Sequence, residues 1–263
     1  LFVVGHWFPI TFLENQKGKF FKSKTQDFVD TNGWWNTITE IDIDNDGNKD
    51  YVVGNLGENN KFHPTKEKPL HIYANNFDDN ETFDMVLSKE YKGNLVPLRG
   101  KECSTQQNSF VSDKTRTYKN FANSTLLDIY GDDALKSSYH REVYEFSSIL
   151  IKNNGDKTFT LQKLPNSAQL GPTLSFEVSD VNNDGLLDVI GVGAIHESEV
   201  ETIRYDANIG YVLAGTKKGN LKTYKDLNFY NAKNAKQIKN IKIGNANLFI
   251  VANNDNMLSI FKQ

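Results

Sequence analysis

Cysteine is almost absent from this chain, and the single Cys103 excludes an intramolecular disulfide. We expect Cys103 to be a partly buried structural thiol rather than a nucleophile. No run of about eighteen apolar residues occurs, so the sequence predicts no transmembrane segment. The chain starts without methionine or a signal peptide, in a strand-like segment, Leu1–Gly5. We therefore expect a piece of a longer polypeptide, for which missing targeting signals mean little.

Basic charge is sparse and is not clustered. The 263 residues carry 30 Lys and Arg against 33 Asp and Glu, for a net charge of −3. Only four of the cations are arginine. Because nucleic-acid-binding domains concentrate Lys and Arg on one face, we expect no nucleic-acid partner.

Familiar catalytic motifs are missing as well. The sequence has no nucleophile elbow, no His-Glu-x-x-His and no phosphate-binding glycine loop. The histidines lack the paired spacing of a zinc site, and we expect each to be a surface or packed residue. They are His6, His63, His71, His140 and His196.

What the chain does contain is a nine-residue acidic pattern that occurs three times. Oxygen-bearing side chains stand at positions 1, 3, 5 and 9 of each copy, whereas position 7 varies. Positions 1, 3, 5, 7 and 9 are Asp42, Asp44, Asp46, Asn48 and Asp50 in the first loop; Asn76, Asp78, Asn80, Thr82 and Asp84 in the middle loop; and Asp180, Asn182, Asp184, Leu186 and Asp188 in the third loop.

These loops have the chemistry of a calcium site. Ca²⁺ takes several oxygen ligands at about 2.3–2.6 Å, and alternating Asp and Asn direct every second side chain inward. Gly47 and Gly185 follow position 5 and permit the positive φ that bends the chain back. By analogy with the EF-hand loop, position 7 contributes its backbone carbonyl. An EF-hand also needs Glu at position 12, where these loops have Val53 and Gly191, so we predict a different kind of calcium loop.

A turn without metal is the alternative, since Asp, Asn and Gly dominate turns in any case. Repetition with shared spacing favours metal binding at the first and third loops. In the middle loop Glu81 replaces the glycine and Asn stands at positions 1 and 5. We leave both interpretations open for that loop.

Short apolar segments flank the loops. Ile41 and Ile43 begin the first, Tyr51–Gly54 follows it, and Val189–Gly193 follows the third. Further short strands alternate with Asn/Gly turns, which is typical of an all-β sandwich, barrel or propeller. Because the repeating unit has four strands, we predict β-propeller blades. We count roughly four blades plus fragments, fewer than a closed ring holds.

One segment, about residues 101–141, loses the β alternation. Thr117–Ala122 and Leu126–Tyr130 show the i, i+3, i+4 spacing of helices. We therefore predict a single propeller region, 1–263, with a helical insertion at about 101–141. Such an insertion is either a recognition segment or a lid that covers an edge or face.

Several blocks resemble a known family. The acidic loops followed by Val-Val-Gly are similar to the FG-GAP/VCBS repeats of integrin α-chain propellers and many secreted bacterial proteins. Longer blocks resemble the C-terminal part of bacterial VCBS-repeat proteins that are related to cartilage acidic protein and often carry an ASPIC/UnbV-type domain elsewhere. These blocks are Gly33–Asn36, Gly54–Asn59, Pro97–Gln107, Leu164–Leu170 and Arg204–Gly210. The resemblance implies a secreted or outer-surface bacterial propeller that binds calcium at the loop positions named above, with no established catalytic role.

Three functions are open on the sequence alone. We favour a non-catalytic, calcium-stiffened module that binds a protein or glycan through loops on one face. The second is a carbohydrate-active enzyme, a lyase or hydrolase, with Glu197 and Asp206 as a candidate carboxylate pair. The third is a purely architectural domain within a larger polypeptide. The polar patch His196–Glu199 is a further candidate site, whereas we expect Trp34 and Trp35 to pack between blades rather than stack on sugars.

Overall fold

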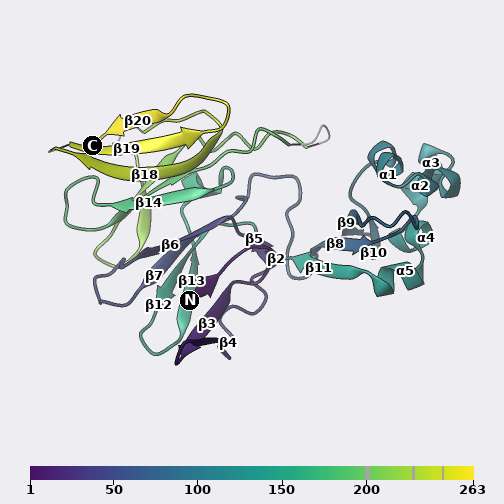
Figure 1. The fold of residues 1–263 in the computed structure, drawn as a ribbon, viewed down its shortest axis with the longest axis horizontal. Helices are drawn as coiled ribbons and strands as arrows, with labels where there is room; N and C mark the ends of the chain where they lie inside the picture. The colour runs from purple at the N-terminus through teal and green to yellow at the C-terminus, as the bar shows by residue number, and fades with distance from the viewer. Residues whose placement is uncertain (199–201, 227–228, 245) are drawn as a thin grey trace. The chain divides into compact units, whose positions relative to one another are not determined.

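The computed structural model describes residues 1–198, 202–226, 229–244 and 246–263. Strands hold 40% of the chain and helices 13%, and the strands form several antiparallel sheets, so the predicted β class is confirmed. The chain forms two compact units (Figure 1). Unit 1 comprises Leu1–His63 and Phe146–Gln263, and unit 2 comprises Pro64–Glu145.

Unit 1 contains four antiparallel sheets of three or four strands each. Sheet 1 has β1 (Phe2–Val3), β3 (Thr11–Gln16) and β4 (Lys19–Lys22). Sheet 2 has β6 (Thr37–Ile41), β7 (Asp50–Gly54), β12 (Ile149–Asn153) and β13 (Phe159–Lys163). Sheet 3 has β14 (Ser175–Ser179), β15 (Asp188–Val192), β16 (Tyr211–Gly215) and β17 (Leu221–Tyr224). Sheet 4 has β18 (Ala235–Ile243), β19 (Ala246–Asn253) and β20 (Ser259–Lys262).

Two smaller elements complete unit 1. Strands β2 (His6–Phe8) and β5 (Gly33–Trp34) pair with each other, and a 3₁₀ turn spans Asn166–Gln169. Among the described residues the sheets form no closed ring. The propeller expected from the sequence is therefore seen only as a series of antiparallel sheets.

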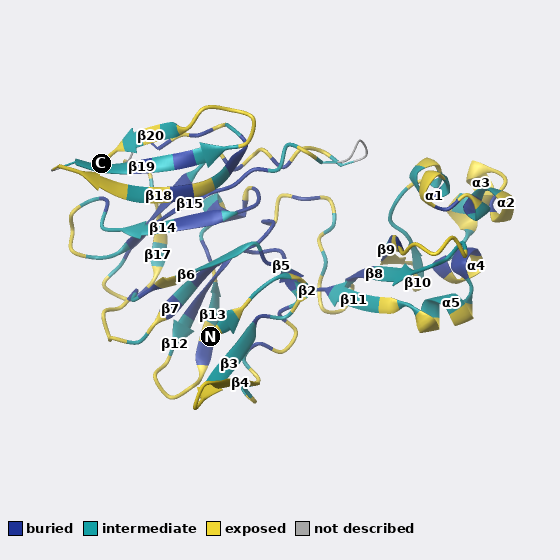
Figure 2. Cartoon of the chain, in the orientation of Figure 1, coloured by how far each residue is buried: buried dark blue, intermediate teal, exposed yellow. Residues whose placement is uncertain are grey.

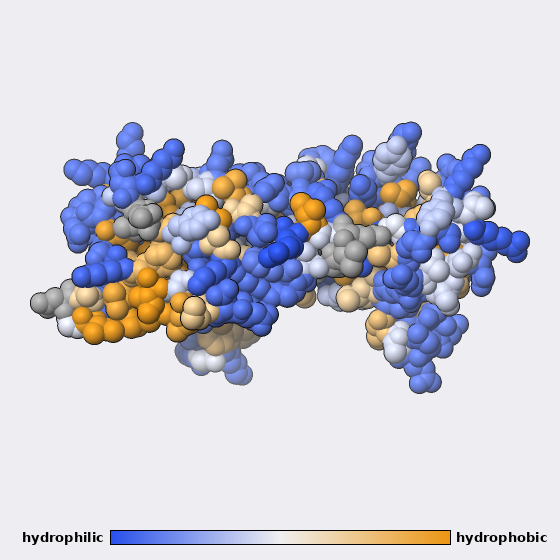
Figure 3. Space-filling model, turned by 90° about the horizontal axis from the view of Figure 1, so that it is seen from above, coloured by the Kyte–Doolittle hydropathy of each residue, from blue (hydrophilic) through white to orange (hydrophobic). Residues whose placement is uncertain are grey.

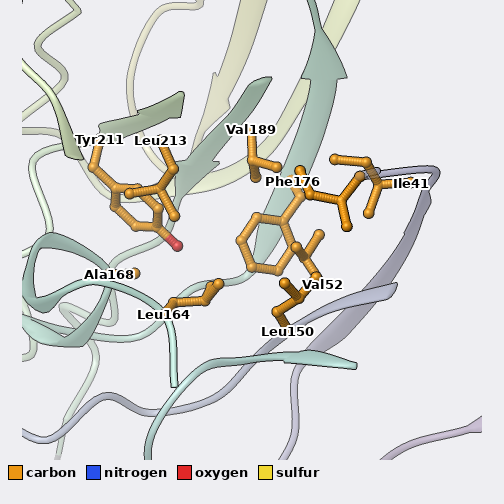
Figure 4. Packing of buried hydrophobic residues seen from close by; sticks show 10 residues of the cluster. Ile41, Val52, Leu150, Leu164, Ala168, Phe176, Val189, Tyr211 and Leu213 are labelled. Carbon is orange, nitrogen blue, oxygen red and sulfur yellow. The ribbon is translucent and has the colours of Figure 1, made fainter. Parts of the chain in front are cut away.

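Each sheet of unit 1 shares a hydrophobic core with the next. Sheets 1 and 2 enclose a cluster that includes Phe12, Trp35 and Phe159. Sheets 2 and 3 enclose the cluster of Figure 4, which contains Leu150, Val52, Phe176, Val189 and Leu213. Sheets 3 and 4 share Ile190, Val212, Ile238 and Phe249. Burial follows the strands between neighbouring sheets, whereas the connecting loops are exposed (Figure 2).

Strand β15 lies between two hydrophobic cores, and its apolar run Val189–Val192 is buried throughout. All five of its residues are buried, because cores lie on both of its faces. Gly191 in this strand leaves room for the Tyr211 ring on β16. A Cβ built on Gly191 would lie 2.2 Å from the Tyr211 ring, and the Tyr211 hydroxyl is hydrogen-bonded to Thr173 Oγ1 at 2.9 Å. Glycine is therefore required here by close packing.

Sheet 4 buries one face and exposes apolar side chains on the other. Phe249 and Val251 face the core shared with sheet 3. Ile241, Ile243 and Ile260 are exposed. Figure 3 looks down on the side of unit 1 that carries sheet 4 and shows apolar side chains gathered there.

Unit 2 is inserted in the chain between β7 and β12 of sheet 2. Its sheet has the order β10-β9-β8-β11, with β8 (Leu70–Asn75), β9 (Asp84–Tyr91), β10 (Asn94–Pro97) and β11 (Tyr139–Val143). Five short helices lie between β10 and β11: α1 (Lys101–Gln107), α2 (Phe110–Lys114), α3 (Tyr118–Asn123), α4 (Leu126–Tyr130) and α5 (Asp132–Ser137).

The helices of unit 2 pack on its sheet. Val111, Leu126 and Ile129 are at most 1% exposed and form one cluster with Val86 of β9. The helical segment and the sheet therefore share one hydrophobic core within unit 2. The predicted insertion at about 101–141 contains the helices, but the inserted unit reaches from Pro64 to Glu145 and includes four strands.

No helix among the described residues is long and apolar enough to cross a bilayer.

Candidate functional site

Each acidic loop connects two neighbouring antiparallel strands, as the flanking apolar segments predict. The first loop joins β6 to β7 in sheet 2, and the third joins β14 to β15 in sheet 3. The middle loop joins β8 to β9. It therefore belongs to unit 2 rather than to the series of sheets in unit 1.

The three loops share one backbone conformation, with positive φ at positions 4 and 6. The φ values are 57°, 57° and 59° at Asn45, Asp79 and Asn183, and 86°, 68° and 84° at Gly47, Glu81 and Gly185. Glycine adopts positive φ without steric cost, whereas a residue with a Cβ adopts it only at a steric cost. Glu81 nevertheless adopts it, so the middle loop keeps the same shape without its glycine.

Position 9, the first residue of the strand that follows each loop, is hydrogen-bonded to position 2 of the loop. Oδ2 of Asp50, Asp84 and Asp188 accepts a hydrogen bond from the backbone N–H of Ile43, Phe77 and Val181, at 3.1, 3.3 and 2.9 Å. In the first and third loops Oδ1 accepts a second bond from the next strand of the sheet. The donors are the N–H groups of Asn153 on β12, at 2.8 Å, and Gly215 on β16, at 2.9 Å.

Burial makes these two anchoring carboxylates costly to ionise. Asp50 is 1% exposed and Asp188 is fully buried. Burial raises the pKa of Asp50 and of Asp188, and the nearby carboxylates of the same loop raise it further. The hydrogen bonds from the backbone N–H groups lower the pKa and so partly offset these two effects. A cation inside the loop would favour the ionised form of each group.

Positions 1 and 5 curl the loop around its own interior. The side chain at position 1 accepts a hydrogen bond from the backbone N–H at position 5 or 6 of the same loop. Asp42 accepts from Gly47 at 3.2 Å, Asn76 from Asn80 at 3.0 Å and Asp180 from Gly185 at 2.9 Å. Position 5 accepts from the N–H of residue 7: Asp46 from Asn48 at 2.7 Å, Asn80 from Thr82 at 2.9 Å and Asp184 from Leu186 at 2.9 Å. A turn without metal makes such bonds too, so they explain the shape of the loop but not its charge.

Position 3 has a different partner in each loop. Asp44 forms an ion pair with Lys152, Asp78 Oδ2 accepts from Asn80 at 3.0 Å, and Asn182 Oδ1 accepts from the Asp184 N–H at 2.9 Å. At position 7, Asn48 donates from its side chain to Asp46 Oδ2 at 2.9 Å, whereas Leu186 has only its backbone carbonyl to offer.

The first loop brings three carboxylates to one point. One oxygen each of Asp42, Asp44 and Asp50 lies within 4.8 Å of the other two, close enough to share one ion. Asp42 Oδ1 is buried and accepts no hydrogen bond from any residue that the structure describes, and the same holds for Asp78 Oδ1 in the middle loop. A buried acceptor without a donor calls for another partner, and a metal ion is one.

In the second candidate from the sequence, the carboxylate pair Glu197 and Asp206, each carboxylate has polar partners of its own. Glu197 accepts hydrogen bonds from Asn254, at 2.8 Å, and from Asn234. The Asn254 bond is the main cause that lowers the pKa of Glu197 to about 2, whereas a general acid needs a raised pKa. Asp206 forms its own ion pair with Arg204, at 3.7 Å. Glu199 of the polar patch lies outside the described residues.

Both tryptophans contact other side chains of unit 1, and Trp35 is buried. Trp35 is 2% exposed, and its indole N–H donates to the Thr31 carbonyl at 2.8 Å. Trp34 is half-buried, with its ring centroid 4.9 Å from that of Phe146. Cys103 is half-buried in α1, which agrees with a structural thiol.

One cluster escapes sequence reasoning. His71 on β8 and His140 on β11 lie side by side, with Nδ1 of the first 3.0 Å from Nε2 of the second. Glu142 Oε1 lies 3.4 Å from His71 Nδ1. His71 is buried and His140 is half-buried, as expected of packed histidines, but the sequence does not predict that they contact each other. Because the two are 69 positions apart, only the pairing of β8 with β11 reveals the cluster.

No family model matches this chain, and no curated protein matches it significantly.

Proposed function

We propose that the first and third loops bind Ca²⁺ and that the chain is a non-catalytic, calcium-stiffened module of a protein that is secreted or carried on the outer cell surface of a bacterium. The observation that carries this proposal is the repeated loop geometry with its converging carboxylates. In the first loop three carboxylates meet within 4.8 Å, and Asp42 Oδ1 is a buried acceptor without a donor among the described residues. Oxygen ligands on a curled loop are what Ca²⁺ prefers.

The sheets of unit 1 support a propeller-like arrangement. Sheets 2 and 3 are four-stranded antiparallel meanders, the form of a propeller blade. The first strand of sheet 3, β14, contacts β6 of sheet 2 and β18 of sheet 4, so the first strands of successive sheets are neighbours. We therefore propose that the four sheets are an arc of blades of the FG-GAP/VCBS type, to which the loop sequences are similar.

Calcium would stiffen these sheets at the point where each loop is anchored. Asp50 on β7 and Asp188 on β15 each link their loop to one neighbouring strand, β12 and β16, through their two hydrogen bonds. Extracellular calcium modules have Kd values of about 10⁻⁴–10⁻³ M, so such sites fill outside the cell. A site filled at ten times its Kd adds about 1.4 kcal/mol to the free energy of unfolding. The ligand that we propose, a protein or glycan held by exposed loops, rests on the family resemblance.

The test is thermal unfolding of the full chain with about 5 mM Ca²⁺ and, separately, with EDTA. In the wild type each filled site should raise the melting temperature by roughly 3–6 °C. The double variant Asp44→Asn and Asp46→Asn should lose the increase that belongs to the first loop. In EDTA it should lose only the contribution of the Asp44–Lys152 ion pair, at most about 1 kcal/mol. In Asp46→Asn the new amide oxygen can still accept the hydrogen bond from the Asn48 N–H, so the turn itself is preserved.

Asp156→Asn is the matched control. Asp156 is an exposed turn carboxylate that accepts from Thr158, at 3.0 Å, and lies outside the three loops. This variant should keep the full calcium effect. If the double variant lost as much stability in EDTA as in Ca²⁺, or if the wild type gained nothing from Ca²⁺, the loops would be turns only.

A further inference from the structure

The His71–His140–Glu142 cluster is held by paired strands of unit 2. Glu142 lies directly opposite His71 in the register of β8 and β11, and His140 lies directly opposite Tyr73. Side chains of directly opposite residues and of residues two apart point to the same face of a sheet. All four side chains therefore share one face, and the strands fix their spacing.

The nitrogens and the oxygen of this cluster converge. His71 Nδ1, His140 Nε2 and Glu142 Oε1 are separated by 3.0, 3.4 and 4.0 Å. Ligands at about 2.0–2.1 Å from a tetrahedral Zn²⁺ lie about 3.3 Å from one another. The three observed separations bracket that value, so small side-chain shifts would place all three atoms around one ion.

The surroundings support ligand geometry. The Tyr144 hydroxyl donates to Glu142 Oε2 at 2.6 Å, which leaves Oε1 directed at the imidazoles. The Tyr73 ring stacks on His140 with a centroid distance of 4.3 Å and an interplanar angle of 16°. Partners of this kind orient the ligands of metal sites in proteins. His71 is only 8% exposed, so its orientation is also fixed by packing.

A pocket in unit 2 reaches the cluster. Tyr73 and His140 line it together with Leu95, Leu126 and Leu135, and its volume is about 530 Å³. An ion therefore has an entry path, and three protein ligands leave a fourth position for water or a small ligand.

We propose that His71 Nδ1, His140 Nε2 and Glu142 Oε1 form a Zn²⁺ site in unit 2, separate from the calcium loops. Two imidazoles and one carboxylate make a nitrogen-rich donor set, which suits Zn²⁺ and is unlike the all-oxygen set of the acidic loops. The Tyr144 hydroxyl acts as the positioning group for Glu142.

The experiment is a Zn²⁺ titration of the full chain after chelator treatment and dialysis, in buffer with excess Ca²⁺ so that the acidic loops do not compete. Wild type should bind one Zn²⁺, and Co²⁺ in its place should give the visible absorption of a four-coordinate site. His140→Ala should weaken binding by more than about a hundredfold, and Tyr144→Phe by about tenfold. His63→Ala, at an exposed histidine of unit 1, is the control and should bind as wild type does.

Glu142→Gln guards against loss of fold, because it keeps the size of the side chain and an oxygen for Tyr144. It should weaken Zn²⁺ binding while far-UV circular dichroism stays unchanged. Absence of Zn²⁺ binding by the wild type would overturn the proposal and leave a hydrogen-bonded histidine pair. Equal affinity in wild type, His140→Ala and Glu142→Gln would overturn it as well. Because Ca²⁺ is present throughout, either result leaves the calcium proposal to its own test.

Discussion

Lys152 Nζ lies 2.9 Å from Asp44 Oδ2, so a lysine of β12 neutralises one carboxylate of the first loop. The residue that follows it, Asn153, donates to the position-9 Asp, as Gly215 does in the third loop. Ala214 is therefore the counterpart of Lys152, and position 3 of that loop is the neutral Asn182. The first loop has one more carboxylate than the third, Asp44, and it also has one more ammonium group beside it, Lys152. The two loops therefore offer a cation the same net charge.

The first prediction follows from this ion pair. Lys152→Met removes a positive charge beside the proposed ion while keeping the stem of the side chain. We expect the Ca²⁺ affinity of the first loop to rise by about two- to fivefold, since a partly exposed pair is worth up to about 1 kcal/mol. Calorimetric titration measures it. Lys163→Met, which removes a lysine bonded to Glu58 instead, should leave the affinity unchanged, and an unchanged affinity in Lys152→Met would contradict the prediction.

The second prediction concerns the strained position of the middle loop. Glu81→Gly should stabilise unit 2 by about 1 kcal/mol, because glycine adopts φ 68° without the steric cost that Glu81 bears. Hydrogen exchange of the β8 and β9 amides in EDTA would report the change within unit 2. Glu81→Ala removes the same charge but keeps a Cβ, and it should give no such gain. A gain of equal size in both variants would point to charge rather than backbone strain.

The third prediction is the reverse change in the third loop. Gly185→Ala should destabilise unit 1 by about 1 kcal/mol. A Cβ at Gly185 would meet nothing within 4 Å, so the cost comes only from its φ of 84°. Urea unfolding in EDTA measures the difference. Gly191→Ala provides a contrast, because there the Cβ would overlap the Tyr211 ring and the loss should be clearly larger.

The fourth prediction is a pH dependence without calcium. Burial raises the pKa of Asp188, so the folded chain holds this proton more strongly than the unfolded chain does. The stability that this carboxyl contributes is present below its ordinary pKa of 3.8 and is lost as the pH rises through the raised value. In EDTA the wild type should therefore lose stability relative to Asp188→Asn between about pH 4 and pH 7. Unfolding curves across that range measure the difference, and a pH-independent gap would refute the assignment.

The fifth prediction tests the independence of the units. Replacing residues 64–145 with a short Gly/Ser linker should leave unit 1 folded, since the rings of Phe62 and Phe146 are already 6.1 Å apart. Deleting only 101–137 should instead unfold unit 2, because Val86 would lose Leu126 and Ile129 from its core. Limited proteolysis separates the two results. Loss of unit 1 in the first deletion would show that the inserted unit supports the sheets around it.

Features set by neighbouring residues were predictable from the sequence. The acidic loops, their positive-φ glycines and the helices at 101–137 depend on spacing within a few residues, which periodicity and turn chemistry describe. The extent of unit 2 could not be predicted from the sequence. Its last strand, β11, pairs with β8 at the other end of the inserted segment. The contact between His71 and His140 depends on the same long-range pairing, so it could not be predicted from the sequence either. The role of Glu81 was also hidden, since tertiary context holds it in a conformation that its own preference disfavours.

The insertion of unit 2 in the chain between β7 and β12 has a consequence for folding. Asn55 and Ser148 are bonded although they are 93 positions apart, and closing so long a loop is entropically expensive. The pairing of Leu70 with Val143 brings the ends of the inserted segment together. If unit 2 folds first, the entropy cost of pairing β7 with β12 is therefore smaller. The Asp50 anchor needs its donor on β12. The first acidic loop, which we propose to bind calcium, is therefore completed only when both halves of unit 1 have met. Calcium bound at this loop would then report that assembly is finished.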